Sequence, residues 1–360
     1  MMVKEYQKNF DFLDFMIVFL SIALKYLKLE FKINDSFMAI YFLFLCVFVL
    51  LKFVKYPVTK KNLLYLMFIL LYCLIITYST ASVDFALSLL LVLIFYNKGY
   101  KQYLYYLFIS SAICFIITII LSNVGILQSE VLTRKVDGVI VTRNSLGFQT
   151  VNGAFLHWFV ILLLYYYLFG FKKYSFIILL AISWYIYLST NTRTGFYCTI
   201  LFMILAPMMN LGSGKLLKKS AKYLFIIFSI ISFVFACKLG ISNNALNELV
   251  SNRFVLWNNA INNHSIQLLV NHALDTYPID NLYINFWQHY GIVAYFGLLL
   301  LYFFGMNKIK DKKLLITMFF FLMYCLFESN HYYYINYSFF ILMYVLIVPN
   351  YQSDKKGGQK

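Results

Sequence analysis

Apolar runs of membrane-spanning length alternate with short polar stretches along almost the whole chain. Because the hydrocarbon core of a bilayer is about 30 Å thick, a helix needs roughly 20 apolar residues to cross it. The pattern predicts twelve helical spans: 12–27, 37–54, 62–79, 81–96, 103–121, 146–169, 174–190, 195–211, 222–239, 282–305, 314–327 and 331–348. The fourth, eighth, eleventh and twelfth of these are short.

The apolar runs also decide between the two ways of spanning a membrane. Runs such as Phe225 to Ala236 lack the in-and-out alternation of a β-barrel strand, so the predicted fold class is all-α. With 62% hydrophobic and 12% charged residues, the chain has too little polar surface for a water-soluble protein of 360 residues. We therefore expect a polytopic membrane protein, residues 1–360 forming a single transmembrane domain, whose first span is retained because no cleavage site follows it.

The net charge of +16 has a topological explanation. Lysines fill the connections that follow even-numbered spans and flank both ends of the chain, which by the positive-inside rule predicts cytoplasmic termini. The basic excess therefore gives no reason to expect a nucleic-acid partner. The lysines of these connections are Lys52, Lys55, Lys60, Lys61, Lys98, Lys101, Lys172, Lys173, Lys215, Lys218, Lys219, Lys222, Lys308, Lys310, Lys312 and Lys313.

Arginine has the opposite distribution from lysine. The chain has 26 lysines but only four arginines, all on outward-facing connections: Arg134, Arg143, Arg193 and Arg253. A guanidinium group stays charged and presents a rigid fork of donors that suits phosphate oxygens. We expect these arginines to bind a diphosphate; the alternative is that they anchor the chain at the interface or pair with Glu130, Asp137 and Glu248.

Two outward connections, 122–145 and 240–281, are much longer than the others and predict the mouth of an active site. The second contains a partly amphipathic stretch from Asn247 to Leu269, which predicts a helix lying across this mouth. It also carries two histidines, His264 and His272, and it ends at Asp280 and Asn281.

Three segments resemble Wzy-type O-antigen and capsular polysaccharide polymerases. They are Arg143 to Asn152 (RNSLGFQTVN), Leu188 to Gly195 (LSTNTRTG), and Asp280 to Tyr283 (DNLY) running on to His289–Val293 (HYGIV). The resemblance implies a GT-C-like polymerase/ligase bundle in the bacterial cytoplasmic membrane. Two positions depart from the family pattern: Val151 stands where relatives often have proline, and Asp280 where ligases have histidine.

The resemblance also implies an activity and partners. The reaction would join oligosaccharide repeats carried on undecaprenyl diphosphate at the outer face of the membrane, within a pathway that includes a flippase and a chain-length regulator. Negative charge on the departing diphosphate has to be stabilised. The chain contains no Asp-x-Asp motif, so we expect a metal-independent glycosyltransferase without a cofactor, in which the diphosphate is held by Arg143, Arg193 and Arg253, with Arg134 as a weaker fourth.

The acceptor hydroxyl needs a general base. Asp280 is the first candidate, although Asp280 or Asn281 before an apolar run is also a common helix cap. His264 and His272 are alternative bases, and the substrate contacts expected are Asn152, Asn281, Tyr283 and Trp257.

Other functions remain open from the sequence. A polysaccharide flippase or other transporter would place charged or helix-breaking residues near the bilayer midplane, whereas here they concentrate in outward loops. An O-antigen-type ligase would share the fold and arginines but use a different acceptor, and a membrane sensor or scaffold would not require outward arginines.

Overall fold

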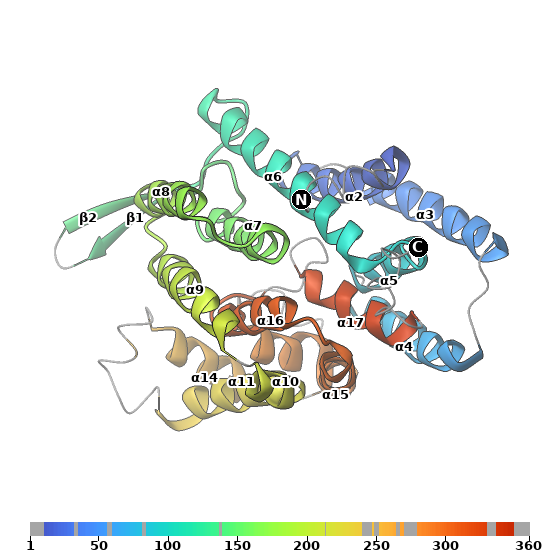
Figure 1. Ribbon diagram of the computed structural model, residues 1–360. Coiled ribbons are helices and arrows are strands. Elements are labelled where there is room, and N and C mark those ends of the chain that lie inside the picture. Colours follow the sequence, from blue (N-terminus) through green and yellow to red (C-terminus); the bar gives the residue numbers. More distant parts are fainter. Residues whose placement is uncertain are drawn as a thin grey trace. The chain divides into compact units, whose positions relative to one another are not determined.

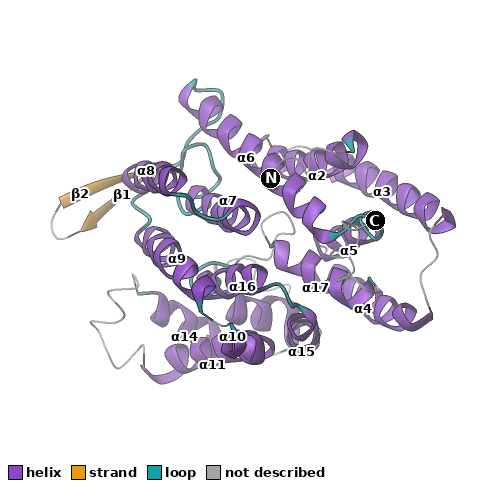
Figure 2. Cartoon of the chain, in the orientation of Figure 1, coloured by secondary structure: helices purple, strands orange, loops and turns teal. Residues whose placement is uncertain are grey.

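The computed structural model is built almost entirely of helices (Figures 1 and 2). It describes residues 11–31, 35–55, 60–80, 84–136, 139–212, 214–239, 247, 252–263, 267–269, 279–329 and 336–348. The helices are grouped in two compact units, each discontinuous in sequence. Unit 1 comprises residues 1–48 and 98–212, and unit 2 comprises residues 49–97 and 213–360.

Unit 1 is organised around two neighbouring helices, α6 (Tyr100–Asn123) and α7 (Gly153–Phe169). Helix α6 packs against α2 (Phe12–Phe31) and α7, and α7 packs against α8 (Lys173–Thr190) and α9 (Arg193–Leu211). Helix α3 (Asp35–Lys55) begins in this unit. Gly195 at the start of α9 permits the close approach to α7, since a Cβ there would lie 2.7 Å from the Phe155 ring.

Unit 2 surrounds a short central helix, α17 (Tyr337–Ile347), of which every residue is buried. A helix that is apolar on all sides is expected in such a position. It packs against α4 (Lys60–Thr80), α5 (Asp84–Ile94) and α15 (Leu282–Lys308). The remaining elements of the unit are α10 (Lys215–Ser220), η1 (Ala221–Tyr223), α11 (Leu224–Val234), η2 (Phe235–Leu239), α14 (Arg253–Asn263) and α16 (Lys312–Tyr324).

The described helices match the predicted apolar segments, each of which contains a helix. Five stretches are long and apolar enough to cross a membrane: Tyr100–Asn123, Lys173–Thr190, Arg193–Leu211, Lys215–Cys237 and Leu282–Lys308. The other helices contribute shorter apolar stretches of 10–17 described residues, so a membrane protein is supported while the number of twelve spans stays a prediction. The single transmembrane domain likewise stays a prediction.

The connection 122–145, which was predicted to face outward, contains structure that the all-α prediction lacked. Strands β1 (Val131–Val136) and β2 (Val139–Asn144) form an antiparallel hairpin in which Leu132 pairs with Arg143. The β-branched residues of both strands favour this conformation. Residues 137 and 138 between them are Asp-Gly, a strong hairpin signal that the sequence analysis overlooked.

The start of the predicted sixth span was also wrong. The segment 146–169 becomes helical only at Gly153, because Leu146 and Gly147 have φ values of 54° and 84° that no α-helix accommodates. The Asn144 side chain accepts a hydrogen bond from the Leu146 amide at 2.7 Å and so stabilises this turn. The residues of the first resemblance motif therefore lie on a strand and turns and not inside a span.

A helix is present within the predicted amphipathic stretch, although it is shorter, and its position across a mouth stays a prediction. Helix α14 covers Arg253–Asn263, within the expected range from Asn247 to Leu269. It packs against the π-helical turn η2, where the Asn258 amide donates to the Ala236 carbonyl at 2.9 Å. A π-turn frees backbone carbonyls in this way and is frequent near functional sites.

Candidate functional site

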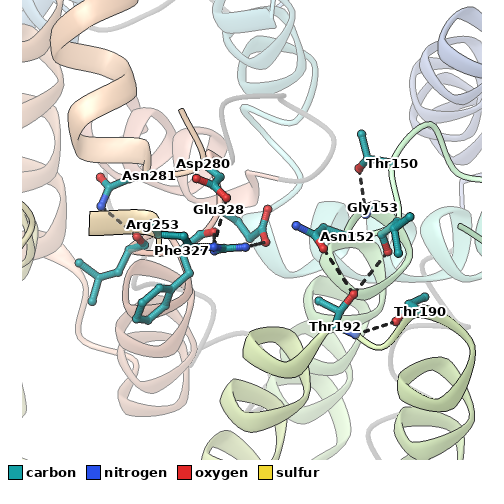
Figure 3. A network of polar contacts seen from close by, with 12 residues as sticks. Thr150, Asn152, Gly153, Thr190, Thr192, Arg253, Asp280, Asn281, Phe327 and Glu328 are labelled. Carbon is teal, nitrogen blue, oxygen red and sulfur yellow. Dashed lines mark hydrogen bonds and ion pairs between the residues drawn. The ribbon is translucent and has the colours of Figure 1, made fainter. Parts of the chain in front are cut away.

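In unit 1, the side chain of Arg143 joins the first two resemblance motifs. Its Nε donates to the Thr190 carbonyl at 2.8 Å, and its Nη2 donates to Asn152 Oδ1 at 3.0 Å and to Thr192 Oγ1 at 3.4 Å. Asn152, Thr190 and Thr192 are labelled in Figure 3. Arg143 and Asn152 come from one motif and the two threonines from the other, so the segments that carry the resemblance are neighbours in space.

The backbone between α8 and α9 presents these threonines. Asn191 ends α8 with φ 47°, a left-handed conformation that asparagine adopts more readily than most residues. The Thr192 amide donates to Thr190 Oγ1 at 3.3 Å, and Thr192 Oγ1 donates to Asn152 Oδ1 at 3.4 Å. The loop is thus held by its own side chains, and the three contacts of Arg143 described above all use neutral oxygens.

The other two arginines of unit 1 are placed differently. Arg193, the first residue of α9, is exposed, and its side chain makes no hydrogen bond or ion pair with the described residues. Arg134 lies in β1 opposite Val141, and its side chain falls outside the described structure. Arg253 belongs to unit 2. Convergence of all four guanidinium groups on one diphosphate therefore stays a prediction.

In unit 2, the guanidinium group of Arg253 contacts two carboxylates and a carbonyl (Figure 3). Its Nε lies 3.2 Å from Asp280 Oδ2, its Nη2 lies 3.3 Å from Glu328 Oε1, and its Nη1 donates to the Phe327 carbonyl. We call Arg253, Asp280 and Glu328 the charge cluster. It connects the start of α14, the residue before the α15 cap and the segment that follows α16.

Burial and charge set the properties of this cluster. The side chains of Arg253 and Glu328 are 9% and 8% exposed, whereas that of Asp280 is 29% exposed. Desolvation alone would lower the pKa of Arg253, but the negative charges of Glu328 and Asp280 outweigh it and raise that pKa above its ordinary value. One guanidinium faces two carboxylates, so the cluster carries an excess of negative charge and Arg253 has little positive field left for a phosphate.

The structure separates the two roles that the sequence left open for Asp280. The cap of α15 is Asn281, whose Oδ1 accepts from the Tyr283 and Ile284 amides at 3.0 Å each. Its Nδ2 donates to Ser232 Oγ at 3.0 Å and to the Leu326 carbonyl at 2.9 Å. Asn281 is completely buried by these contacts. Asp280 is therefore free of the capping role.

The carboxylate of Asp280 is oriented by Arg253 through one oxygen only. Its Oδ2 is the atom near Arg253, whereas Oδ1 is buried and accepts no hydrogen bond from the described residues. Glu328, the other carboxylate, was not among the predicted site residues. The sequence did contain a signal for it, because Glu328 is the acidic residue that follows the eleventh predicted span, on the side that was predicted to face outward with the arginines.

The two predicted aromatic contacts are part of the packing. Tyr283 is completely buried and its hydroxyl donates to the Leu322 carbonyl at 2.8 Å. Trp257 is 1% exposed and lies in an apolar cluster with Phe254 and Ile284. Neither ring presents a face to solvent in this structure. The two predicted alternative bases, His264 and His272, lie outside the described residues.

The third resemblance motif contains a break in α15. Gly291 has φ 82°, which interrupts the helix and leaves the amides of Ile292 and Val293 without helical partners. They donate instead to the carbonyls of Gln267 and Leu268 at 3.1 and 3.2 Å. A Cβ at position 291 would lie 3.0 Å from both carbonyl oxygens, so the break requires glycine.

The described residues contain no group of three or more histidine, cysteine, aspartate and glutamate side chains arranged to hold a metal ion. Comparisons with protein-family models, with curated proteins and with solved structures each find no match for this chain.

Proposed function

We propose that this protein is a membrane glycosyltransferase that polymerises undecaprenyl-diphosphate-linked oligosaccharide repeats on the outer face of the bacterial cytoplasmic membrane. The observation that carries the proposal is the geometry of Asp280, a partly exposed carboxylate that Arg253 holds through Oδ2 while Oδ1 is unpartnered. A general base needs one oxygen held in place and the other without a competing hydrogen-bond donor, and the Asp280 carboxylate meets both conditions within the described residues.

In the proposed reaction, the acceptor sugar hydroxyl donates its proton to Asp280 Oδ1. Its oxygen forms a bond with the anomeric carbon of the donor glycan, and the bond from that carbon to the lipid diphosphate breaks with its electron pair. The diphosphate leaves as an anion whose charge must be stabilised as the bond lengthens. No redox change or co-reactant is required.

The contacts of the arginines divide their roles in this proposal. Arg253 contacts two carboxylates and acts as a positioning residue for Asp280, whereas its binding of the diphosphate stays a prediction from the sequence. Arg193, exposed and without a partner among the described residues, is the group best able to bind the departing diphosphate. Arg143 is also assigned to the diphosphate, and its contacts hold Asn152 and the loop that precedes Arg193.

A second candidate function is transport of the same lipid-linked glycan. The observation in its favour is the break at Gly291, the tenth of the 27 residues of α15, because broken helices with buried polar residues form the binding sites of many transporters. A ligase that transfers the glycan to another acceptor shares the proposed chemistry and differs only in the acceptor hydroxyl.

An assay in proteoliposomes separates these functions. Purified protein is reconstituted with one lipid-linked repeat unit, and both the length of the lipid-linked glycan and the leaflet of the substrate are measured. A polymerase produces longer lipid-linked glycans without moving the substrate between leaflets. Movement of the substrate without lengthening would refute the polymerase and support the transporter.

A further inference from the structure

Several polar side chains of α14 and α15 are buried with atoms that lack hydrogen-bond partners. Gln288 is 3% exposed, and neither its Oε1 nor its Nε2 is bonded within the described structure. Asn285 donates through Nδ2 to the Ile279 carbonyl at 3.1 Å, but its Oδ1 accepts nothing. Trp257 Nε1 is likewise unbonded. Buried polar groups are nearly always hydrogen-bonded, so each of these atoms calls for an explanation.

Asn285 and Gln288 lie on one side of α15, a short distance along the chain after Asp280 of the charge cluster. With 3.6 residues per turn, positions 281, 285 and 288 fall within about 60° of one another around the helix axis. Ile284, on the same side, packs in one apolar cluster with Trp257 and Phe254 of α14. This side of α15 therefore faces α14. It runs about 10 Å along the axis from Asn281 to Gln288.

The unbonded atoms define the chemistry of a ligand. Asp280 Oδ1, Asn285 Oδ1 and Gln288 Oε1 are acceptors, whereas Gln288 Nε2 and Trp257 Nε1 are donors. A phosphate oxygen can only accept, and the excess negative charge of the charge cluster repels it. A sugar hydroxyl both donates and accepts, and it carries no charge. The set is therefore complementary to a polyol and not to a diphosphate.

We propose that Gln288 and Asn285 bind hydroxyl groups of the glycan whose reacting hydroxyl donates to Asp280, with Trp257 Nε1 as a further donor. The assignment of the polyol as this glycan rests on the proposed function. Binding hydroxyl groups along about 10 Å of α15 orients the sugar so that one hydroxyl meets the base. Gln288 and Asn285 are thus specificity-determining residues of the same site.

The test compares Gln288→Met with a matched control, Asn307→Met. Both substitutions remove an amide from α15, but Asn307 is exposed near the opposite end of the helix. Two quantities are measured: the melting temperature without ligand, and the affinity for the oligosaccharide repeat released from its lipid, followed by tryptophan fluorescence. Undecaprenyl diphosphate without a glycan serves as the second probe.

We expect Gln288→Met to melt at a higher temperature than the wild type, because it removes an unpaired buried amide. Its affinity for the free oligosaccharide should fall at least tenfold, while that for undecaprenyl diphosphate stays unchanged. Asn307→Met should match the wild type in all three measurements. Gln288→Glu, which keeps the shape but replaces the donor by an acceptor, should also weaken oligosaccharide binding.

The inference is wrong if the wild-type protein does not bind the free oligosaccharide, or if Gln288→Met binds it as tightly as the wild type. It is also wrong if Gln288→Met melts at a lower temperature than the wild type or fails to fold, because the amide would then have a structural role. Failure of the proposed function is distinguishable. Wild-type protein that binds the oligosaccharide through Gln288 but never lengthens it refutes the polymerase and leaves this site intact.

Discussion

Replacing Arg253 by methionine tests the charge cluster directly. The substitution keeps much of the side-chain volume but removes the guanidinium group beside Glu328, whose side chain is 8% exposed. Removing one partner of a buried ion pair costs about 3–5 kcal/mol, because the remaining charge stays buried while its attraction to that partner is lost. At roughly 2–4 °C per kcal/mol, the melting temperature should fall by on the order of 10 °C.

A second substitution distinguishes this electrostatic effect from a loss of packing. Glu328→Gln removes the buried charge, so the variant carrying both Arg253→Met and Glu328→Gln should lose less stability than the sum of the two single losses. Glu328→Gln alone leaves the Arg253–Asp280 pair intact and should cost only the charged hydrogen bond, about 1.5–3 kcal/mol. The coupling between the two positions should then reach about 1–3 kcal/mol.

The four proteins of this double-mutant cycle are compared by thermal unfolding in one detergent, with Arg193→Met as the matched control. Arg193 is exposed and unpartnered among the described residues, so its loss should leave the melting temperature nearly unchanged. The reasoning fails if Arg253→Met melts with the wild type, or if the double variant loses the sum of the two single losses.

Further predictions concern the other parts of the chain. Arg193→Ala should reduce chain lengthening by about 100-fold or more without changing the melting temperature, measured by glycan length analysis in proteoliposomes. Arg143→Lys keeps the charge but not the forked contacts, so both chain lengthening and the melting temperature should fall, the stability by about 1.5–3 kcal/mol. Gly291→Ala forces a side chain into a left-handed conformation against two carbonyls, and thermal unfolding should reveal a loss of about 1–3 kcal/mol. The Lys98–Asp11 ion pair, at 2.5 Å, should make stability pH-dependent at both extremes. The hydrogen bond from Lys98 lowers the pKa of Asp11 below 3.8, so this contribution is present above pH 3.8 and lost as the pH falls through the lowered value. Burial opposes ionisation of Lys98, but its carboxylate partners outweigh this and raise its pKa above 10.5, so its contribution is present below pH 10.5 and lost above the raised value. Lys98→Met should flatten both limbs of a plot of melting temperature against pH.

The helical architecture was largely predictable because apolar runs of this length have few other structures available. Each predicted run contains a helix, and α14 lies within the stretch predicted to be an amphipathic helix. The hairpin was predictable in principle from its β-branched strands and the Asp-Gly between them. It was missed because the whole connection was interpreted as a polar loop.

The candidate site was predictable in its residue types but not in its pairings. Arg253 was expected to bind a diphosphate, yet it pairs with Glu328, which is 75 positions away and follows a different helix. Whether Asp280 or Asn281 caps α15 depends on side-chain geometry that two adjacent polar residues do not determine. The break at Gly291 depends on carbonyls of the distant residues Gln267 and Leu268, so a glycine within an apolar run gave no sign of it.

The connections at the start of α15 bear on the choice between polymerase and carrier. Arg253 links α14 to Asp280 and Glu328, the side-chain Nδ2 of Asn281 donates to the Leu326 carbonyl, and the backbone amide of Leu282 donates to the Cys325 carbonyl at 2.9 Å. Alternating access requires one side of a site to open in every cycle, and opening here would break a buried ion pair together with these backbone contacts. A glycosyltransferase has the opposite requirement, since its base must stay within hydrogen-bond reach of the acceptor hydroxyl. The network of contacts therefore favours a fixed carboxylate over a gate. Weakening this network by Arg253→Met should impair chain lengthening in a polymerase, whereas in a carrier the looser gate would speed up movement of the substrate.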